Sequence, residues 1–248
     1  MKAHAVTNIG LVRTENQDAC ALREIAAHAG ILAVVCDGMG GAAGGRVASS
    51  KAIAQFLSAA EAALGEHTPP LTPIAVQQIF ADAVYRANRE VFDLAVITPE
   101  LQGMGTTLTA VLLLPQTAYI ANIGDSRAYL LRGGHLKRIT HDDSYVQRMI
   151  DEGRMTEEEA AASGRRNLLT RALGTKPYTD FRFDSLPLMQ GDRLLLCSDG
   201  LTVCCDDARI SSILCISEEA KEAANALLAA ALGAGAPDNV TVAVVDVN

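Results

Sequence analysis

The sequence predicts a layered α/β sandwich in one domain. Short apolar runs follow one another directly, and the longest amphipathic segments come as a pair. A fold of repeating β-α-β units would alternate strands and helices instead. The chain has 248 residues with a hydrophobic fraction of 49%, which is enough for one sizeable core. We therefore expect a single domain that spans residues 1–248.

The strands are predicted from runs of apolar residues. Gly133-Gly134 separates two such runs and predicts a hairpin. The predicted strands are Ile31–Cys36, Thr106–Leu114, Thr117–Ile123, Ala128–Leu131, Arg193–Cys197 and Val240–Val247.

Three longer segments predict helices. The first ends at Gly65, a residue type that commonly follows a helix. The second begins with Thr72 as N-cap and Pro73 at the first helical position. The third begins at Ser217, with two glutamates in its first turn, and ends near Gly233. Between Ser144 and Arg166 lies a polar segment in which a capping box predicts one short helix.

Composition excludes several functional classes. The net charge is -8, which disfavours binding to a nucleic-acid backbone. The six cysteines show neither zinc spacing nor a disulfide framework, so free thiols in the cytoplasm are expected. The first ten residues lack the apolar stretch of a signal peptide, and no apolar run is long enough for a membrane span. We expect no nucleic-acid partner and no membrane partner.

Aspartates stand at the ends of four predicted strands. Each one alone is compatible with an ordinary turn, because Asp and Gly dominate turns. Together, several carboxylates on one rim of a sandwich would repel one another unless cations neutralise them. Carboxylate, carbonyl and water are the ligands of magnesium and manganese. The four residues are Asp37, Asp125, Asp199 and Asp238.

Two neighbouring segments have competing interpretations. The glycine-rich stretch from Asp37 to Gly45 satisfies a relaxed dinucleotide-binding pattern, but Asp37 would oppose a pyrophosphate, and no acidic residue ends a second strand at the expected distance. Arg13, in the polar run before Asp18, is compatible with a solvated turn. Beside an acidic metal rim, its guanidinium fork could grip two phosphate oxygens.

Six motifs, in this order, resemble the metal-dependent protein phosphatase family of the 2C type in its compact bacterial form. They extend from near the first residue to near the last. The motifs are Val12-Arg13-Thr14-Glu15-Asn16-Gln17-Asp18, Cys36-Asp37-Gly38-Met39-Gly40-Gly41, Gly103-Met104-Gly105-Thr106-Thr107, Ile123-Gly124-Asp125-Ser126-Arg127, Cys197-Ser198-Asp199-Gly200-Leu201 and Pro237-Asp238-Asn239-Val240-Thr241.

The resemblance implies an α+β fold, a four-layer αββα sandwich with two central, mostly antiparallel sheets and a mobile flap at roughly residues 144–166. It also implies two divalent metals, manganese or magnesium. Asp37 would bridge both, and the Gly38 carbonyl would bind one. Asp199 and Asp238 would hold the other. Asp18 would order metal-bound water.

The remaining roles follow from the same resemblance. Arg13 would clamp the phosphate, and Asp125, together with Asn167, would hold a third, weaker metal. The implied reaction is hydrolysis of phosphoserine and phosphothreonine on proteins by a metal-bridging hydroxide. In signalling, this reaction would reverse the action of a bacterial Ser/Thr kinase. Met39 stands where some members carry a proton-donating His, so the general acid is left open.

Other enzyme classes share this chemistry. A small-molecule phosphomonoesterase would use the same site, and so would a two-metal phosphodiesterase, although the acidic charge and 4% aromatic content argue against nucleic-acid substrates. A catalytically dead binding module on the same fold would have lost the metal carboxylates, which are present. The substrate proteins and the choice of metal are left open, and a monomer is the default.

Overall fold

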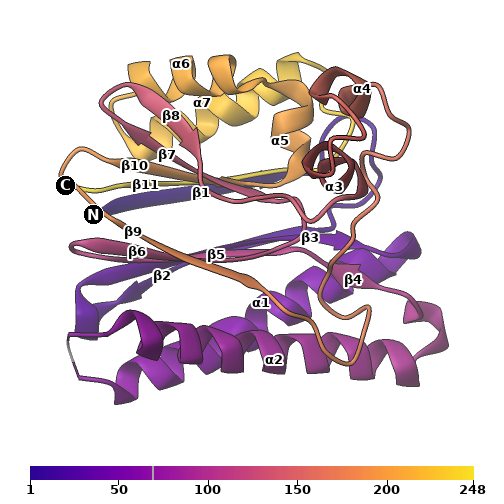
Figure 1. The fold of residues 1–248 in the computed structure, drawn as a ribbon, viewed down its shortest axis with the longest axis horizontal. Helices are drawn as coiled ribbons and strands as arrows, with labels where there is room; N and C mark the ends of the chain where they lie inside the picture. The colour runs from indigo at the N-terminus through magenta and orange to yellow at the C-terminus, as the bar shows by residue number, and fades with distance from the viewer. Residues whose placement is uncertain (69) are drawn as a thin grey trace.

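The computed structural model describes residues 1–68 and 70–248, without the side chains of residues 42, 43 and 161. Two β-sheets stack in the middle of the molecule, and helices cover the outer face of each sheet (Figure 1). Within the described residues, every pair of named strands is antiparallel. The predicted four-layer αββα sandwich is confirmed.

One sheet contains five strands in the order β1-β11-β10-β7-β8. Strand β11, between β1 and β10, is buried along its whole length, because it lies between α7 and the other sheet. The strands are β1 Lys2–Asn8, β7 Arg127–Arg132, β8 His135–Arg138, β10 Arg193–Cys197 and β11 Val240–Asp246.

The second sheet has six strands, five of which run in the order β2-β3-β5-β6-β9, while β4 pairs only with β3. The predicted strand over residues 106–114 is divided between β4 and β5, with Thr107 between them. The strands are β2 Asp18–Ile25, β3 Gly30–Met39, β4 Gly105–Thr106, β5 Leu108–Leu114, β6 Thr117–Ile123 and β9 Arg182–Pro187.

Helices α1 and α2 cover the second sheet, and α5, α6 and α7 cover the first (Figure 1). Helices α3 and α4 lie at one end of the sandwich, in the segment predicted as a flap. The helices are α1 Gly41–Glu66, α2 Pro73–Ile97, α3 Tyr145–Asp151, α4 Glu157–Ala161, α5 Asp199–Cys204, α6 Asp207–Ile216 and α7 Ala220–Gly233, with short 3₁₀ turns at Ala26–His28 and Pro99–Leu101.

Three apolar layers hold the sandwich together. One lies between α1, α2 and the second sheet, where the rings of Phe56 and Phe80 are 5.5 Å apart. A second lies between the first sheet and helices α5, α6 and α7. The third, built from Val, Leu, Ile and Ala, fills the space between the two sheets. Burial of this apolar surface is the main favourable term for folding.

Local sequence signals set several helix and turn boundaries. Thr72 caps α2 by accepting a hydrogen bond from the Ala75 N–H at 3.2 Å, as predicted. The predicted capping box at α4 is present, and Gly133 and Gly134 form the hairpin turn with positive φ angles of 55° and 81°.

Some predicted boundaries were wrong. Ser217 does not begin the third helix. It ends α6, where its hydroxyl donates to the Ile213 carbonyl, and α7 starts only at Ala220. Gly65 lies inside α1, which continues for one more residue. Within the described part of the chain, no helix combines the length and apolar character that a membrane crossing requires.

Candidate active site

Asp18 and Asp37 are paired directly in the β2–β3 register, so their side chains lie on the same face of the sheet. Asp18 is 8% exposed, and its Oδ2 accepts hydrogen bonds from Ser198 Oγ and Thr241 Oγ1, each at 2.7 Å. Its Oδ1 is buried and has no hydrogen-bond partner among the described residues. Because a buried carboxylate oxygen normally has a partner, this atom indicates a missing donor or cation.

Asp199 and Asp238 lie next to the ends of two adjacent strands of the other sheet, β10 and β11. Asp199 is the first residue of α5, just after β10, and Asp238 lies just before β11. Gly200 permits their close approach, because a Cβ there would lie 1.9 Å from the Asn239 carbonyl oxygen. Asp37 lies near both, because after burial and Asp18 the charges of Asp199 and Asp238 help to raise its pKa. Neither Asp37-Gly38 nor Asp199-Gly200 forms a hairpin turn, so the turn interpretation was wrong for both.

Arg13 faces this cluster from the loop after β1. Its Nη2 donates to Asp238 Oδ2 at 2.6 Å, and its side chain is 51% exposed. Asn239 holds the same loop, since its Nδ2 donates to the carbonyls of Ile9 and Glu15 and its Oδ1 accepts from the Gln17 N–H. Asn239 was not among the predicted site residues. Its place next to Asp238 in the last motif was the signal that could have found this role.

A second glycine, Gly45, packs closely against the Gly38 carbonyl. The Gly38 N–H donates to the Gln17 carbonyl at 3.1 Å, and a Cβ on Gly38 would lie 2.0 Å from the Gly45 carbonyl oxygen. In the other direction, a Cβ on Gly45 would lie 2.6 Å from the Gly38 oxygen. The two glycines therefore let the start of α1 pack directly against the end of β3.

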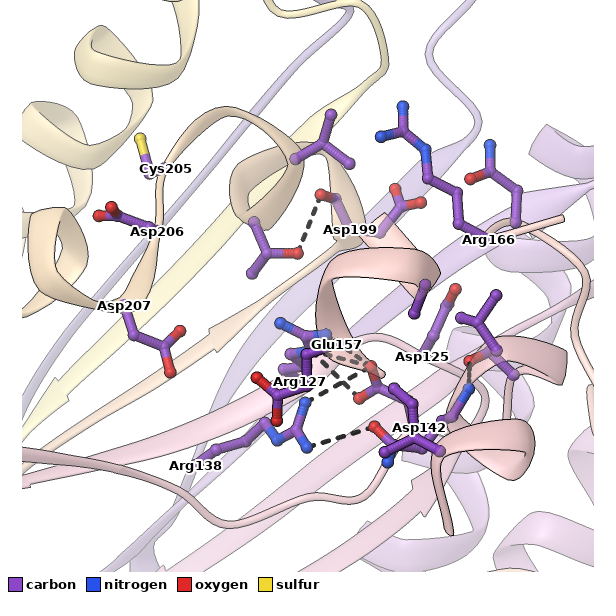
Figure 2. A pocket seen from close by; sticks show the side chains of 18 residues that line it. Asp125, Arg127, Arg138, Asp142, Glu157, Arg166, Asp199, Cys205, Asp206 and Asp207 are labelled. Atoms are coloured by element: carbon purple, nitrogen blue, oxygen red, sulfur yellow. Dashed lines mark hydrogen bonds and ion pairs between the residues drawn. The ribbon is translucent and has the colours of Figure 1, made fainter. Parts of the chain in front are cut away.

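Asp125 and Asn167 line one cavity of about 660 Å³ together with Asp199. Figure 2 shows Asp125, Asp199 and Arg166 around this cavity. Arg166 was not among the predicted site residues, although its charge lowers the pKa of Asp199. It directly precedes Asn167 in the sequence, and this adjacency was the signal that sequence reasoning missed.

Burial and mutual repulsion disfavour the ionised carboxylates. Burial first, and then the charges of Asp18 and Asp199, raise the pKa of Asp37 well above its ordinary value. Burial raises the pKa of Asp18 to about 6 and that of Asp125 to about 8, and the charge of Asp199 adds to both. The pKa of Asp199 is raised by burial and then by Asp238, whereas Arg13 lowers it. Such a cluster binds either protons or cations.

The donor set fits divalent cations of the magnesium and manganese type. Among the described residues, no three His, Cys, Asp or Glu side chains form a ready-made metal site, and Asp238 is paired with Arg13. Carboxylate and carbonyl oxygens are nevertheless the ligands that hard cations prefer. The unpartnered Oδ1 of Asp18 and the repulsion among the carboxylates fit the same conclusion.

Comparison with known proteins agrees with this geometry. Residues 12–234 match the family described as Protein phosphatase 2C. The chain belongs to the protein phosphatase 2C family. Its sequence motifs had predicted this family, and the prediction is confirmed. Members of the family are metal-dependent hydrolases.

Phosphatase 2C relatives resemble this chain along almost all of its length. The serine/threonine protein phosphatase PstP of Mycobacterium tuberculosis is 44% identical over 239 residues, which cover 96% of this chain and 43% of PstP. The chain thus spans less than half the length of that relative. The serine/threonine phosphatase stp of Listeria monocytogenes is 34% identical over 246 residues, covering 99% of this chain and 96% of stp.

A solved structure shows the same fold with metal. The catalytic domain of PstP in complex with two manganese ions superposes with a TM-score of 0.84 at 39% identity, covering 99% of this chain and 97% of that one. The two manganese ions belong to that structure and match the number of metals expected from the sequence.

Proposed function

We propose that this chain is a serine/threonine protein phosphatase that uses two divalent cations. The observation that carries the proposal is the convergence of Asp37, Asp199 and Asp238 beside the half-exposed guanidinium of Arg13. In this proposal, Asp37 and the Gly38 carbonyl hold one cation, and Asp199 and Asp238, with Asp37 shared, hold the other. When bound, such cations supply a water of lowered pKa and neutralise phosphoryl charge.

The chain's own residues have distinct roles in this reaction. Arg13 grips two phosphoryl oxygens with its guanidinium fork, after leaving Asp238. Asp18, fixed by Ser198 and Thr241, keeps its free Oδ1 available to orient water. Met39 has no proton to donate. None of the five histidines lines the cavity beside Asp125, so the leaving oxygen takes its proton from water or another residue.

The outer parts of the site have proposed roles as well. Asp125 and Asn167 hold a third, weaker cation in the cavity that they share. Residues 144–166 act as a mobile flap beside this cavity, within a catalytic domain that spans residues 1–248. The flap contains two short helices, α3 and α4, and the three glutamates of α4 are exposed, which favours local mobility.

The proposed substrates are phosphorylated proteins, in signalling that opposes a Ser/Thr kinase. PstP and stp are named as serine/threonine phosphatases, which supports this substrate class. All six cysteines are free thiols, which supports a reducing cytoplasm. We propose a monomer, either manganese or magnesium as the metal, and no nucleic-acid partner.

Phosphate release from phosphothreonine, phosphoserine and phosphotyrosine peptides tests the proposal, with manganese and with chelator. We expect manganese-dependent release from the first two peptides and almost none from Asp199→Asn, which removes one proposed ligand charge. Full activity after chelation and gel filtration would refute the two-metal mechanism. A strong preference for a phosphodiester, or for small phosphomonoesters over peptides, would favour the alternative enzyme classes instead.

A further inference from the structure

The hydroxyl of Thr107 replaces a β-ladder hydrogen bond at Asp37. Val35 pairs with Thr109 and Gly38 pairs with Thr106, so the same register places Thr107 opposite Asp37. The Thr107 N–H donates to the Asp37 carbonyl at 2.8 Å, as in an ordinary ladder. The Asp37 N–H, however, donates to Thr107 Oγ1 at 2.8 Å instead of to the Thr107 carbonyl.

The same side chain contacts the loop that carries Asp125. Thr107 Oγ1 lies 2.8 Å from Ser126 Oγ, in hydrogen-bond contact, and both residues are buried. The methyl group of Thr107 packs under Gly124, where a Cβ would lie 2.6 Å from Thr107 Cγ2. Thr107 therefore sits between the backbone of Asp37 and both neighbours of Asp125.

The connection continues to the base of the proposed flap. The Gly124 N–H donates to Asp143 Oδ2 at 3.2 Å, and the Asp143 N–H donates back to the Gly124 carbonyl at 2.8 Å. The Asp143 carbonyl accepts a hydrogen bond from the Thr170 N–H at 2.7 Å, on the chain that leaves the flap. The end of β3, the Asp125 loop and the flap base are thus joined through Thr107.

We infer that Thr107 is a positioning residue that fixes Asp37 relative to Asp125, so that one buried hydroxyl governs how tightly the carboxylate cluster holds divalent cations. This inference rests on the proposed function, because the cations are those of the proposed phosphatase. Without the hydroxyl, the Asp37 N–H loses its partner, and the backbone must shift to find another. A shift of that backbone moves the carboxylate that both cations would share.

The chain offers a matched control at Thr109. This threonine is also fully buried, and its hydroxyl donates to Asn122 Oδ1 at 2.6 Å and to the Ser126 carbonyl at 3.0 Å. Thr109→Val thus removes a buried hydroxyl near the Asp125 loop without touching Asp37. Thr107→Ser keeps the hydroxyl of Thr107 and removes only its methyl group.

Calorimetric titration of the metal-stripped full chain with Mn²⁺, together with its thermal unfolding, tests the inference without requiring turnover. We expect Thr107→Val to weaken Mn²⁺ binding about tenfold, as loss of a residue that supports a ligand typically does. Thr107→Ser should bind within about threefold of wild type. Thr109→Val should melt at lower temperature but bind within about the same threefold range.

Other outcomes would overturn the inference. One is a folded Thr107→Val protein that binds Mn²⁺ as tightly as wild type. Another is a loss of Mn²⁺ affinity in Thr109→Val equal to the loss in Thr107→Val. Should Thr107→Val not fold, Thr107→Cys replaces it. Its thiol is a weaker acceptor, so wild-type Mn²⁺ affinity in that variant would again overturn the inference. A wild type that takes up no Mn²⁺ would overturn the proposed function itself, and this inference with it.

Discussion

The guanidinium of Arg13 donates to Asp238 Oδ2 at 2.6 Å, so the proposed phosphate clamp is paired with a proposed metal ligand. Cation binding at Asp238 and phosphate binding by Arg13 would both break this contact. Cation binding at Asp238 thereby frees Arg13 to bind phosphate, and phosphate binding by Arg13 frees Asp238 to bind a cation. Since the Arg13 side chain is 51% exposed, the ion pair itself contributes little to stability.

Arg13→Ala should therefore impair catalysis and leave metal binding intact. A charge-assisted contact to phosphate contributes about 1.5–3 kcal/mol, so we expect kcat/KM to fall roughly ten- to a hundredfold. Arg13→Lys should lie between alanine and wild type, because lysine keeps the charge and loses the fork. Steady-state kinetics and Mn²⁺ titration on the same preparations provide the measurement.

Arg23→Ala is the matched control for Arg13. Arg23 is also an arginine in an ion pair, with Glu61, and its side chain is 52% exposed, but it lies on β2 away from the cluster. We expect its kcat/KM to equal that of wild type. A loss of Mn²⁺ affinity in Arg13→Ala comparable to its loss of kcat/KM would contradict the proposed role.

Metal-free protein should become less stable as pH rises. Asp18 and Asp125 have folded-state pKa values of about 6 and about 8, both raised above the ordinary value for Asp. The folded state then binds more protons than the unfolded state, so this stability is fully present below about pH 4 and is lost as pH rises through 6 and 8. We expect the Tm to fall by several degrees between pH 5 and pH 8.5.

Saturating Mn²⁺ should remove most of this pH dependence, because cations stabilise the ionised carboxylates. Asp18→Asn should make the Tm of the metal-free protein depend less on pH near pH 6. Differential scanning calorimetry with chelator and with Mn²⁺ makes the comparison. A metal-free Tm that rises steadily over this range would contradict the prediction, because it would show that folding does not raise the pKa values of these carboxylates.

Sequence reasoning worked best where an element is buried on both sides. The bounds of β6 and β10 were predicted to the residue, since a buried strand inside a sandwich is mostly apolar. Strands β1, β2 and β9 were missed, because they lie at sheet edges and mix polar with apolar residues. Helix α5 was missed because Asp199-Gly200 at its start has the composition of a turn.

The candidate site was predicted through its aspartates, and the structure brings Asp37, Asp199 and Asp238 together. What the sequence could not provide was the set of contacts that depend on register between distant strands. The hydroxyl of Thr107 meets the Asp37 N–H only because β4 and β5 pair with β3 in one register. The loop contacts of Asn239 depend in the same way on how β11 lies against β1.

Asp125→Asn should separate the roles of metal ligand and turn residue. Asparagine suits the same turn, so folding should be retained. Loss of the charge should raise the metal-free Tm above pH 8, because the pKa of Asp125 is raised to about 8. We expect lower turnover on phosphopeptides with two cations still bound, measured by kinetics and metal analysis. Asp184→Asn, on the exposed face of β9, is the control, and wild-type turnover in Asp125→Asn would refute the third-metal role.

Gly45→Ala should damage the metal site from the side of α1. Its Cβ would lie 2.6 Å from both the Gly38 carbonyl oxygen and Gln17 Oε1, too close for either atom to stay in place. We therefore expect a lower Tm and about tenfold weaker Mn²⁺ binding, in line with the loss of support for a metal ligand.

Gly65→Ala is the matched control in the same helix, because no neighbouring atom lies within 4 Å of its Cβ position. That change should stabilise the protein by about 0.5–1 kcal/mol, since alanine loses less backbone entropy in a helix. Equal Mn²⁺ affinities in the two variants would show that the Gly38 carbonyl is not a ligand.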